Sequence, residues 1–243
     1  MSRKMLTISY IGTNYCGWQV QKNGLSVQEC VCNAFYKLYG CDVSVTGCSR
    51  TDSGVHAINY CLHFDDTKSL DNIKIVKALN VYLPDDIAAI SCVDVKSDFH
   101  ARYSCKEKTY KYKIYIGERN PFLNNRAYRY YKDIDIEKIN NFAKNLLGKH
   151  DFTSFCSAGS SVEDKVRTLK EAYASVEDDV ITFTFTADGF LYNMVRILSG
   201  TFLAVNEGKI NENDAIRILE SKSREMAGNT LPAHGLYLYN IKY

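Results

Sequence analysis

The amino-acid sequence predicts an α+β protein built from two halves with the same order of elements, β-α-β-β-α-β. Hydrophobic residues recur at every second position in some segments and at helical spacing in others, and this succession occurs twice along the chain. The chain has 243 residues, 46% hydrophobic and 24% charged, which is enough for a sizeable core. It has only three Pro and no Gly/Ser-rich linker. We therefore expect the halves to share one mostly antiparallel mixed sheet, with helices on one face and a cleft on the other.

The elements of the first half follow from periodicity and from residues that begin or end helices. Ser26-Val27-Gln28-Glu29 is a capping box, and Gly40 is placed to end the helix that it begins. Pro84 stops a second, amphipathic helix. The predicted elements are a strand at 6–10, a helix at 27–38, strands at 43–45 and 58–64, a helix at 71–83 and a strand at 87–95.

The second half repeats this order. A hairpin is predicted across Glu177-Asp178-Asp179, Gly148 is placed to end the first helix, and Asn213 or Asn211 is available to cap a short extra helix. The predicted elements are a strand at 109–116, a helix at 136–146, strands at 169–176 and 180–186, a long helix at 190–205, the extra helix at 213–221 and a strand at 236–241.

This repeated order is the split β-α-β unit of ferredoxin-like folds. The boundary between the halves is expected near 99–106. We therefore predict two domains, residues 1–104 and residues 105–243.

The nine Cys are scattered and form no C-x-x-C pair and no Cys/His cluster at zinc-finger spacing. We interpret them as reduced, mostly buried residues, which indicates a cytoplasmic protein without a structural metal. No apolar run approaches the roughly 18 residues of a membrane span. P-loop and G-x-G-x-x-G signatures are absent as well, so we expect no nucleotide cofactor.

The net charge of +2 conceals an uneven distribution. The segment 102–132 has nine basic residues and two acids, a balance of +7, and it contains seven of the 18 Tyr. Basic residues interleaved with aromatic ones offer contacts to phosphates and stacking faces for bases. A solvated strand face with Tyr packed beneath it is the alternative that this pattern leaves open.

The densest polar cluster is the segment 47–57, between two predicted strands. Asp52-Ser53-Gly54 is a turn signal, and an Asp in such a turn often bonds only its own backbone. Arg50 is near enough in sequence to pair with Asp52, but it is equally able to point into solvent. His56 is a single His, for which a structural role is the simpler interpretation.

Eight short motifs are spread over nearly the whole chain. The longest is Arg50-Thr51-Asp52-Ser53-Gly54-Val55-His56-Ala57, in the polar cluster. The other seven are G-W-Q at 17–19, S-V-Q at 26–28, D-F-H-A-R-Y-S at 98–104, K-T-Y-K-Y at 108–112, D-F-T-S-F at 151–155, M-V-R at 194–196 and G-L-Y-L at 235–238. Together they resemble, in the same order, the motifs of the TruA-type tRNA pseudouridine synthases, and the segment 50–57 closely resembles the catalytic loop of that family.

The resemblance implies a function and a set of site residues. Asp52 would be the catalytic aspartate that starts the conversion of uridine to pseudouridine. Tyr110 would stack on the target base, Arg50 would assist its extrusion from the RNA, and Arg196 would pair with Asp52. A guanidinium beside a carboxylate favours the ionised form that such chemistry needs. The free face of the sheet would then be the catalytic cleft.

The resemblance also implies the partners. The substrate would be the anticodon stem-loop of tRNA, modified at positions 38, 39 and 40, and the protein would be a homodimer. Lys106, Lys108, Lys111 and Arg102 would hold the RNA backbone. The reaction is an isomerisation without redox change, so it requires no cofactor. The family often has Asp, Gly and Ala where this chain has Ile11, Ser49 and Ser53.

Two other functions compete with this interpretation. Paired ferredoxin-like units commonly bind RNA without catalysis, but a pure binding module does not need an ionised Asp beside arginines. A glycoside hydrolase with two carboxylates would need a second positioned acid, and no motif supplies one.

Overall fold

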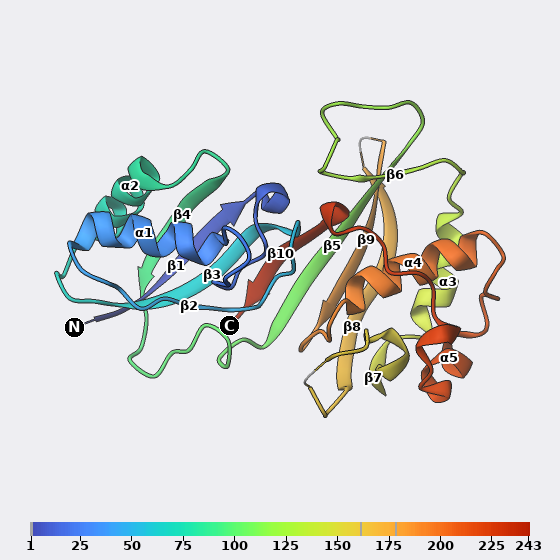
Figure 1. The fold of residues 1–243 in the computed structure, drawn as a ribbon. Coiled ribbons are helices and arrows are strands. Elements are labelled where there is room, and N and C mark those ends of the chain that lie inside the picture. The colour runs from blue at the N-terminus through green and yellow to red at the C-terminus, as the bar shows by residue number, and fades with distance from the viewer. Residues whose placement is uncertain (1, 161, 178) are drawn as a thin grey trace. The chain divides into compact units, whose positions relative to one another are not determined.

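The structure is a computed structural model that describes residues 2–160, 162–177 and 179–243. Helices alternate with strands, and nearly all strand pairs are antiparallel, so the predicted α+β class is confirmed. The chain divides into two compact units: unit 1 comprises residues 1–106 and 238–243, and unit 2 comprises residues 107–237. Figure 1 shows the elements of both units.

Unit 1 has the order β-α-β-β-α-β that the sequence predicts. Its strands lie in the order β4-β1-β3, with β2 and the last strand, β10, also beside β3. Strand β1 is antiparallel to both β3 and β4. The helices α1 and α2 pack beside each other (Figure 1). The elements are β1 (Ser2–Tyr10), α1 (Val27–Tyr39), β2 (Thr46–Gly47), β3 (His56–Asp66), α2 (Asn72–Tyr82), β4 (Ile87–Asp94) and β10 (Leu236–Lys242).

The helices in unit 1 are capped by local residues, of which Ser26 and Gly40 were predicted and Asp71 was predicted only as part of the helix. The Ser26 hydroxyl accepts the backbone N–H of Glu29 at 3.2 Å, and Gly40 ends α1 in a left-handed conformation, with φ of 70°. Such a conformation disfavours residues with a Cβ. Asp71 caps α2 by accepting two backbone N–H groups. Local sequence therefore sets where both helices begin.

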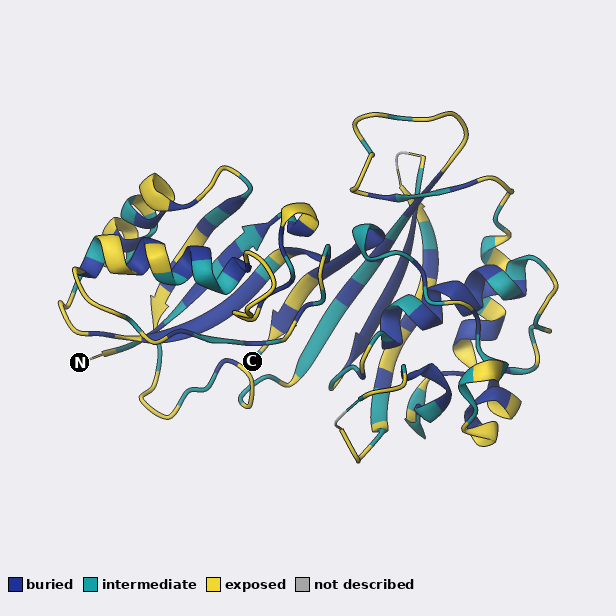
Figure 2. Cartoon of the chain, viewed as in Figure 1, coloured by how far each residue is buried: buried dark blue, intermediate teal, exposed yellow. Residues whose placement is uncertain are grey.

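Unit 2 is built on the strand order β5-β9-β8-β7, in which all neighbours are antiparallel, and β6 pairs in parallel with β5. Figure 2 shows that α4 is almost completely buried, whereas α5 has exposed positions. The elements are β5 (Glu107–Ile116), β6 (Tyr128–Tyr130), α3 (Ile136–Lys144), β7 (Gly148–Asp151), β8 (Val166–Glu177), β9 (Val180–Ala187), α4 (Met194–Asn206) and α5 (Ala215–Ser221).

The core of unit 2 is a cluster of phenylalanines. Phe202 of α4 lies 5.2 Å, centroid to centroid, from both Phe183 and Phe185 of β9, and 6.2 Å from Phe142 of α3. All four side chains are fully buried. Tilted and edge-on ring pairs of this kind add to the hydrophobic contribution of their buried area. The cluster fixes α4, which carries Arg196, against the sheet.

Four predictions about secondary structure are wrong. The short strand predicted at 43–45 lies at Thr46–Gly47 instead. The helix predicted from residue 190 begins at Met194, because Asn193 has a left-handed backbone with φ of 59° that breaks the helical path. Gly148 does not end α3; with φ of 105° it opens β7, which the periodicity did not reveal.

The fourth wrong prediction concerns the cap of α5. The residue before α5 is Asp214, while Asn211 and Asn213 bond each other in the preceding turn, with the N–H of Asn213 donated to the Asn211 side chain at 2.9 Å. The predicted hairpin between β8 and β9 is present, and Asp179 has the positive φ of a tight turn, 62°. Asp178 of that turn lies outside the described residues. No helix in the described ranges is long and apolar enough to span a membrane.

Candidate active site

The loop that carries Asp52 joins β2 to β3 in unit 1, and its own backbone holds its shape. The carbonyl of Asp52 accepts the N–H of Val55 at 3.2 Å, and Gly54 has a positive φ of 78°. The N–H of Gly54 and the hydroxyl of Ser53 both donate to the carbonyl of Tyr15, at 3.3 and 3.2 Å. The turn signal in the sequence thus corresponds to a real turn, which is tied to the segment after β1.

Residues on both sides of Asp52 are anchored in the core. The Thr51 hydroxyl shares a hydrogen bond of 2.8 Å with the Tyr10 hydroxyl, and the Thr51 carbonyl accepts the N–H of Trp18 at 3.1 Å. His56 is completely buried, and its Nδ1 accepts the N–H of Gly12 at 2.9 Å. His56 is therefore a structural residue. Asp52 is partly exposed and lies in a loop that these contacts make rigid.

Two glycines allow the segment after β1 to approach this loop. A Cβ at Gly17 would overlap the carbonyl oxygen of Thr51, and the backbone there has φ of 96°, which is strained for any other residue. A Cβ at Gly12 would overlap the carbonyl oxygen of Val55. The G-W-Q motif thus has a physical role: its glycine forms part of the support beneath the Asp52 loop.

Unit 1 contains a cavity of about 280 Å³ beside this loop. Arg50 and Arg102, which are far apart in the sequence, both line it, and no acidic residue is among the lining residues. These residues are Trp18, Gln19, Gln28, Val45, Thr46, Gly47, Ser49, Arg50, His100, Arg102 and Tyr103. The cavity therefore combines two guanidinium groups with aromatic rings and polar side chains.

One wall of this cavity is a rigid aromatic stack. Trp18 stacks on Tyr60 with 4.2 Å between ring centroids, and the Tyr60 hydroxyl donates to the carbonyl of Ser49 at 2.5 Å. Gly47 passes against both rings, where a Cβ would meet the indole and the phenol. This packing fixes the backbone that leads directly to Arg50.

Two histidines hold the turn that supplies His100, Arg102 and Tyr103 to the cavity lining. Nδ1 of His100 accepts the N–H groups of Arg102 and Tyr103, each at 3.2 Å, and Nδ1 of His63 accepts the N–H of Ala101 at 3.1 Å. Burial lowers the pKa of His63, with Arg3 and His100 acting in the same direction, so the ring remains a neutral acceptor. The turn presents the Tyr103 ring to solvent with 77% of its surface exposed.

Tyr110 lies in unit 2, in the middle of β5. Its side chain is only 7% exposed, and the Phe190 ring meets it edge-on at 5.1 Å. Its neighbour across the antiparallel pairing with β9 is Phe185. Lys108 shares a face of β5 with Tyr110, whereas Lys111, an odd number of residues away, belongs to the opposite face.

Arg196 lies in the first turn of α4, and its guanidinium is oriented by two acceptors. Nε donates to the carbonyl of Leu231 at 2.6 Å, and a terminal nitrogen donates to the Asn193 side chain at 2.7 Å. Asn193 in turn donates to the Ser157 hydroxyl at 3.0 Å, just after the D-F-T-S-F motif. Residues beside two motifs of unit 2, together with the carbonyl of Leu231, thus orient one guanidinium.

The predicted site residues are therefore distributed over both units. Asp52, Arg50, Arg102 and Lys106 belong to unit 1, and Tyr110, Arg196, Lys108 and Lys111 belong to unit 2. The cavity brings Arg50 and Arg102 together. The two histidine acceptors and Trp18 were missed as site residues by sequence reasoning, because only the fold shows which backbone groups they contact.

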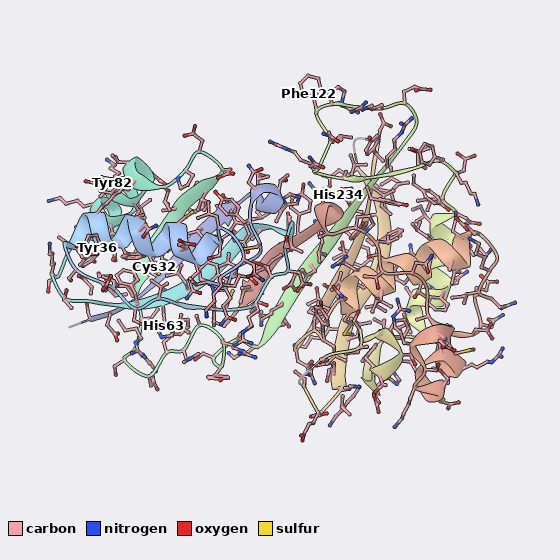
Figure 3. All side chains as sticks on the ribbon, in the orientation of Figure 1. Cys32, Tyr36, His63, Tyr82, Phe122 and His234 are labelled. Carbon is pink, nitrogen blue, oxygen red and sulfur yellow. The ribbon has the colours of Figure 1, made fainter. Side chains whose placement is uncertain are left out.

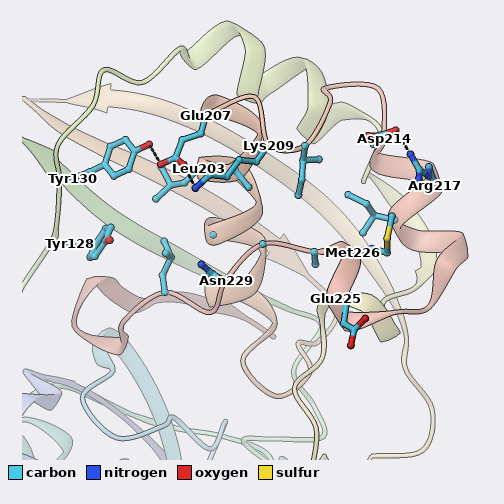
Figure 4. A pocket seen from close by; sticks show the side chains of 17 residues that line it. Tyr128, Tyr130, Leu203, Glu207, Lys209, Asp214, Arg217, Glu225, Met226 and Asn229 are labelled. Atoms are coloured by element: carbon cyan, nitrogen blue, oxygen red, sulfur yellow. Dashed lines mark hydrogen bonds and ion pairs between the residues drawn. The ribbon is translucent and has the colours of Figure 1, made fainter.

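A larger cavity of about 530 Å³ lies in unit 2 and contains none of the predicted site residues (Figure 4). Its charged lining residues are three acids and two bases, and four of these five lie in ion pairs. Glu207 bonds the Tyr130 hydroxyl at 2.8 Å and Lys209 at 2.5 Å, and these partners lower the pKa of Glu207 to about 2. Arg217 lies 3.6 Å from Asp214.

Comparison with known proteins identifies the family. A family model described as tRNA pseudouridine synthase matches residues 6–104 and 142–243. The proteins named tRNA pseudouridine synthase A from Anoxybacillus flavithermus and Caldicellulosiruptor saccharolyticus are each 43% identical over all of this chain, covering 99% and 100% of the relative. The one from Clostridium acetobutylicum is 44% identical, with complete coverage of both chains. The chain belongs to the tRNA pseudouridine synthase family.

The family predicted from these motifs is thus confirmed. In this synthase, the two matched regions include the Asp52 loop, the His100 turn and Arg196, while the unmatched segment 105–141 includes Tyr110 and most of the basic, Tyr-rich stretch. The geometry shows what several motifs do: they support the Asp52 loop, line the adjacent cavity or orient Arg196. Among the described residues, no group of three or more His, Cys, Asp or Glu side chains forms a metal site.

Proposed function

We propose that this synthase converts uridines 38, 39 and 40 of the tRNA anticodon stem-loop to pseudouridine, and that Asp52 starts the reaction. The family supplies the reaction class, an isomerisation. The observation that carries the assignment of the site is the rigid loop of Asp52, in which Ser49 and Arg50 line a cavity with two arginines and no acid, while Asp52 itself is not among the lining residues. A cationic site next to a carboxylate is suited to chemistry on a nucleotide held by its phosphates.

The reaction is balanced without any co-reactant. The bond between N1 of the base and C1′ of the ribose breaks, the base turns, and a bond forms between C5 and C1′. The proton leaves C5, and N1 gains a proton, so the product is an isomer of the substrate. No electron is transferred, and the proposal requires no cofactor.

Asp52 begins this sequence as a carboxylate, acting as a nucleophile at C1′ or at C6 of the base, or as a base that removes a sugar proton. In each case the carboxylate must already be aligned when the nucleotide arrives. The bonds from Thr51, Ser53 and Gly54 hold the loop in one shape before substrate binds. Such preorganisation removes part of the entropic barrier to reaction.

Tyr110 and Arg196 complete the proposed site. Phe190 restrains the Tyr110 ring, which makes it a fixed surface on which the extruded uracil stacks. A phenol with an ordinary pKa near ~10 is a poor base at neutral pH, so stacking is its main role. For Arg196 the role that the family resemblance implies is to pair with the Asp52 carboxylate, because a guanidinium beside a carboxylate favours its ionised form. Arg50 assists extrusion of the nucleotide from its stack.

The RNA backbone is held by basic side chains on both units. Arg102 is placed for this role by the His100 turn, and Lys106, Lys108 and Lys111 provide further positive charge.

We also propose that the protein acts as a homodimer and that it acts in the cytoplasm.

The test of this function uses purified protein and tRNA transcripts labelled with tritium at C5 of uridine. We expect tritium release from a transcript with uridines at 38, 39 and 40, and none when all three are replaced by cytidine. Transcripts that keep one uridine each then show which positions are modified. Release that continues without any of the three uridines would contradict the proposed positions, and no release from any tRNA would contradict the activity.

A further inference from the structure

The loop between β5 and β6, residues 117–127, carries the most exposed of the large hydrophobic side chains in the described part of the chain. The side chain of Phe122 is 87% exposed and stands at the tip of this loop (Figure 3). We call residues 117–127 the Phe122 loop. A single exposed hydrophobic residue is ordinary in proteins, so the meaning of Phe122 depends on how the loop holds it and on its surroundings.

Hydrogen bonds inside the Phe122 loop hold it in a sequence of turns. The Asn120 side chain accepts the N–H of Phe122 at 2.9 Å, and the Leu123 carbonyl accepts the N–H groups of Arg126 and Ala127 at 2.9 and 3.0 Å. Pro121 fixes one backbone dihedral beside Phe122. These hydrogen bonds restrain the backbone of the loop, and Phe122 is exposed on it.

Both ends of the Phe122 loop are also fastened to unit 2. The Tyr237 hydroxyl donates to the Arg126 carbonyl at 2.6 Å, and Nε of Arg129 donates to the Gly117 carbonyl at 2.9 Å. An aromatic side chain on a restrained loop loses little conformational entropy when it binds a partner. The ring is thus presented in a form that is ready to bind.

The surroundings of Phe122 are basic. Arg119 and Arg126 are exposed, and within the described residues neither guanidinium makes a hydrogen bond or an ion pair. Just beyond the loop, the Arg129 guanidinium lies 4.9 Å from the centre of the Tyr131 ring, which is 75% exposed. Glu118 is the single acid between residues 117 and 132. Exposed rings among unpaired cations match the chemistry of a nucleic acid more closely than that of an apolar protein surface.

We propose that the Phe122 loop is an RNA-contacting surface, in which Phe122 stacks on an unpaired base of the tRNA while Arg119 and Arg126 bind the flanking phosphates. This proposal rests on the proposed function, since it takes tRNA as the ligand. The loop lies in the segment that the family model does not match, between residues 104 and 142. The loop contains none of the residues to which the proposed function assigns the chemistry.

The test compares variants by their affinity for tRNA and by their rate at saturating enzyme. Phe122→Ala is expected to weaken binding about tenfold, the typical effect of losing one base–aromatic stack, and Phe122→Trp to preserve it. Tyr36→Ala removes another exposed ring, on α1, and serves as the matched control with unchanged affinity. All these variants should form pseudouridine at the wild-type rate once the tRNA is saturated, because the loop holds substrate and does not react with it.

Salt dependence separates the two kinds of contact. Arg119→Ala combined with Arg126→Ala should reduce the slope of log affinity against log salt by about two, whereas Phe122→Ala should leave it unchanged. Equal tRNA affinity for wild type and Phe122→Ala would overturn the loop proposal while leaving the synthase activity in place. Dissociation of a wild-type dimer into monomers by Phe122→Ala, seen by light scattering, would also overturn it, because the loop would then contact protein. Absence of both binding and pseudouridine formation in the wild type would overturn the proposed function itself.

Discussion

The cavities described in unit 1 and unit 2 differ in charge as well as in size. The cavity of unit 2 is the larger, about 530 against 280 Å³, and its lining has three acidic residues, Glu207, Asp214 and Glu225, against two basic ones, Lys209 and Arg217. The cavity of unit 1 has two arginines and no acid. A phosphate-bearing ligand is attracted by an excess of positive charge, so we propose the smaller cavity as the functional one. Cavity volume alone would point to the other cavity.

The two regions also use close backbone packing for different purposes. In unit 1, Gly17 and Gly12 bring a loop against the backbone of the Asp52 loop. In unit 2, Gly200 of α4 and Gly228 pack against each other, and the N–H of Gly228 donates to the Thr201 hydroxyl at 2.9 Å. The contacts of Gly17 and Gly12 support the loop that carries Asp52. The contact between Gly200 and Gly228 supports the backbone segment whose Leu231 carbonyl orients Arg196.

The largest effect among the supporting residues is expected for Gly17→Ala. The new Cβ would overlap the Thr51 carbonyl and displace the Asp52 loop. A shift of about 1 Å in a catalytic group costs on the order of 100-fold in rate, so pseudouridine formation should fall by about that factor. Gly208→Ala is the matched control: its φ is also positive, 71°, but a Cβ there meets nothing within 4 Å. It should lose about 1 kcal/mol of stability and keep its activity. Equal activity of the two variants would show that the loop position does not matter.

A smaller effect is expected for the arginines of the unit 1 cavity. Arg50→Ala and Arg102→Ala should each weaken tRNA binding, by roughly tenfold for a charge-assisted contact worth about 1.5 kcal/mol, and reduce the salt slope by about one. Lys209→Ala in the unit 2 cavity should change neither quantity. Filter binding at several salt concentrations measures both. A loss of affinity in Lys209→Ala that matched the arginine variants would remove the distinction between the cavities.

The smallest effect on function is expected for Glu207→Gln, which should reduce stability without reducing tRNA binding. Lys209, Tyr130 and Lys132 lower the pKa of Glu207 from 4.5 to about 2. Because the folded state binds this proton less readily than the unfolded state, its stabilising contribution is present above pH 4.5 and is lost as pH falls towards 2. Denaturation of wild type and Glu207→Gln at several pH values should therefore show a difference at pH 7 that shrinks below pH 4.5. A difference that did not depend on pH would contradict this account.

Much of the fold was predictable because local physics decides it. Ser26, Gly40 and Asp71 act on backbone groups within a few residues, so their roles are visible in the sequence. The strand β7 and the start of α4 were not predictable, since positive φ values at Gly148 and Asn193 are set by tertiary packing. A strand as short as β6 cannot be recognised from periodicity, because it has only three residues. It forms because it pairs with β5.

The candidate site also has residues that the sequence suggested and contacts that only the fold shows. Motif resemblance supplied Asp52, Arg50, Tyr110 and Arg196 as candidates, and their roles stay predictions. It did not show that imidazole nitrogens of His63 and His100 accept backbone N–H groups and so place Arg102. Those contacts join residues up to 38 positions apart, and only the folded chain brings them together.

The central claim is that the carboxylate of Asp52 performs the chemistry while the surrounding residues hold the RNA. Asp52→Asn keeps the size and hydrogen-bonding capacity of the side chain but removes its charge and nucleophilicity. With tRNA labelled with tritium at C5 of uridine, we predict that this variant binds tRNA with wild-type affinity and releases tritium only at the rate seen without enzyme, whereas Asp85→Asn, an exposed control, behaves as wild type. Tritium release by Asp52→Asn at or near the wild-type rate would contradict the account.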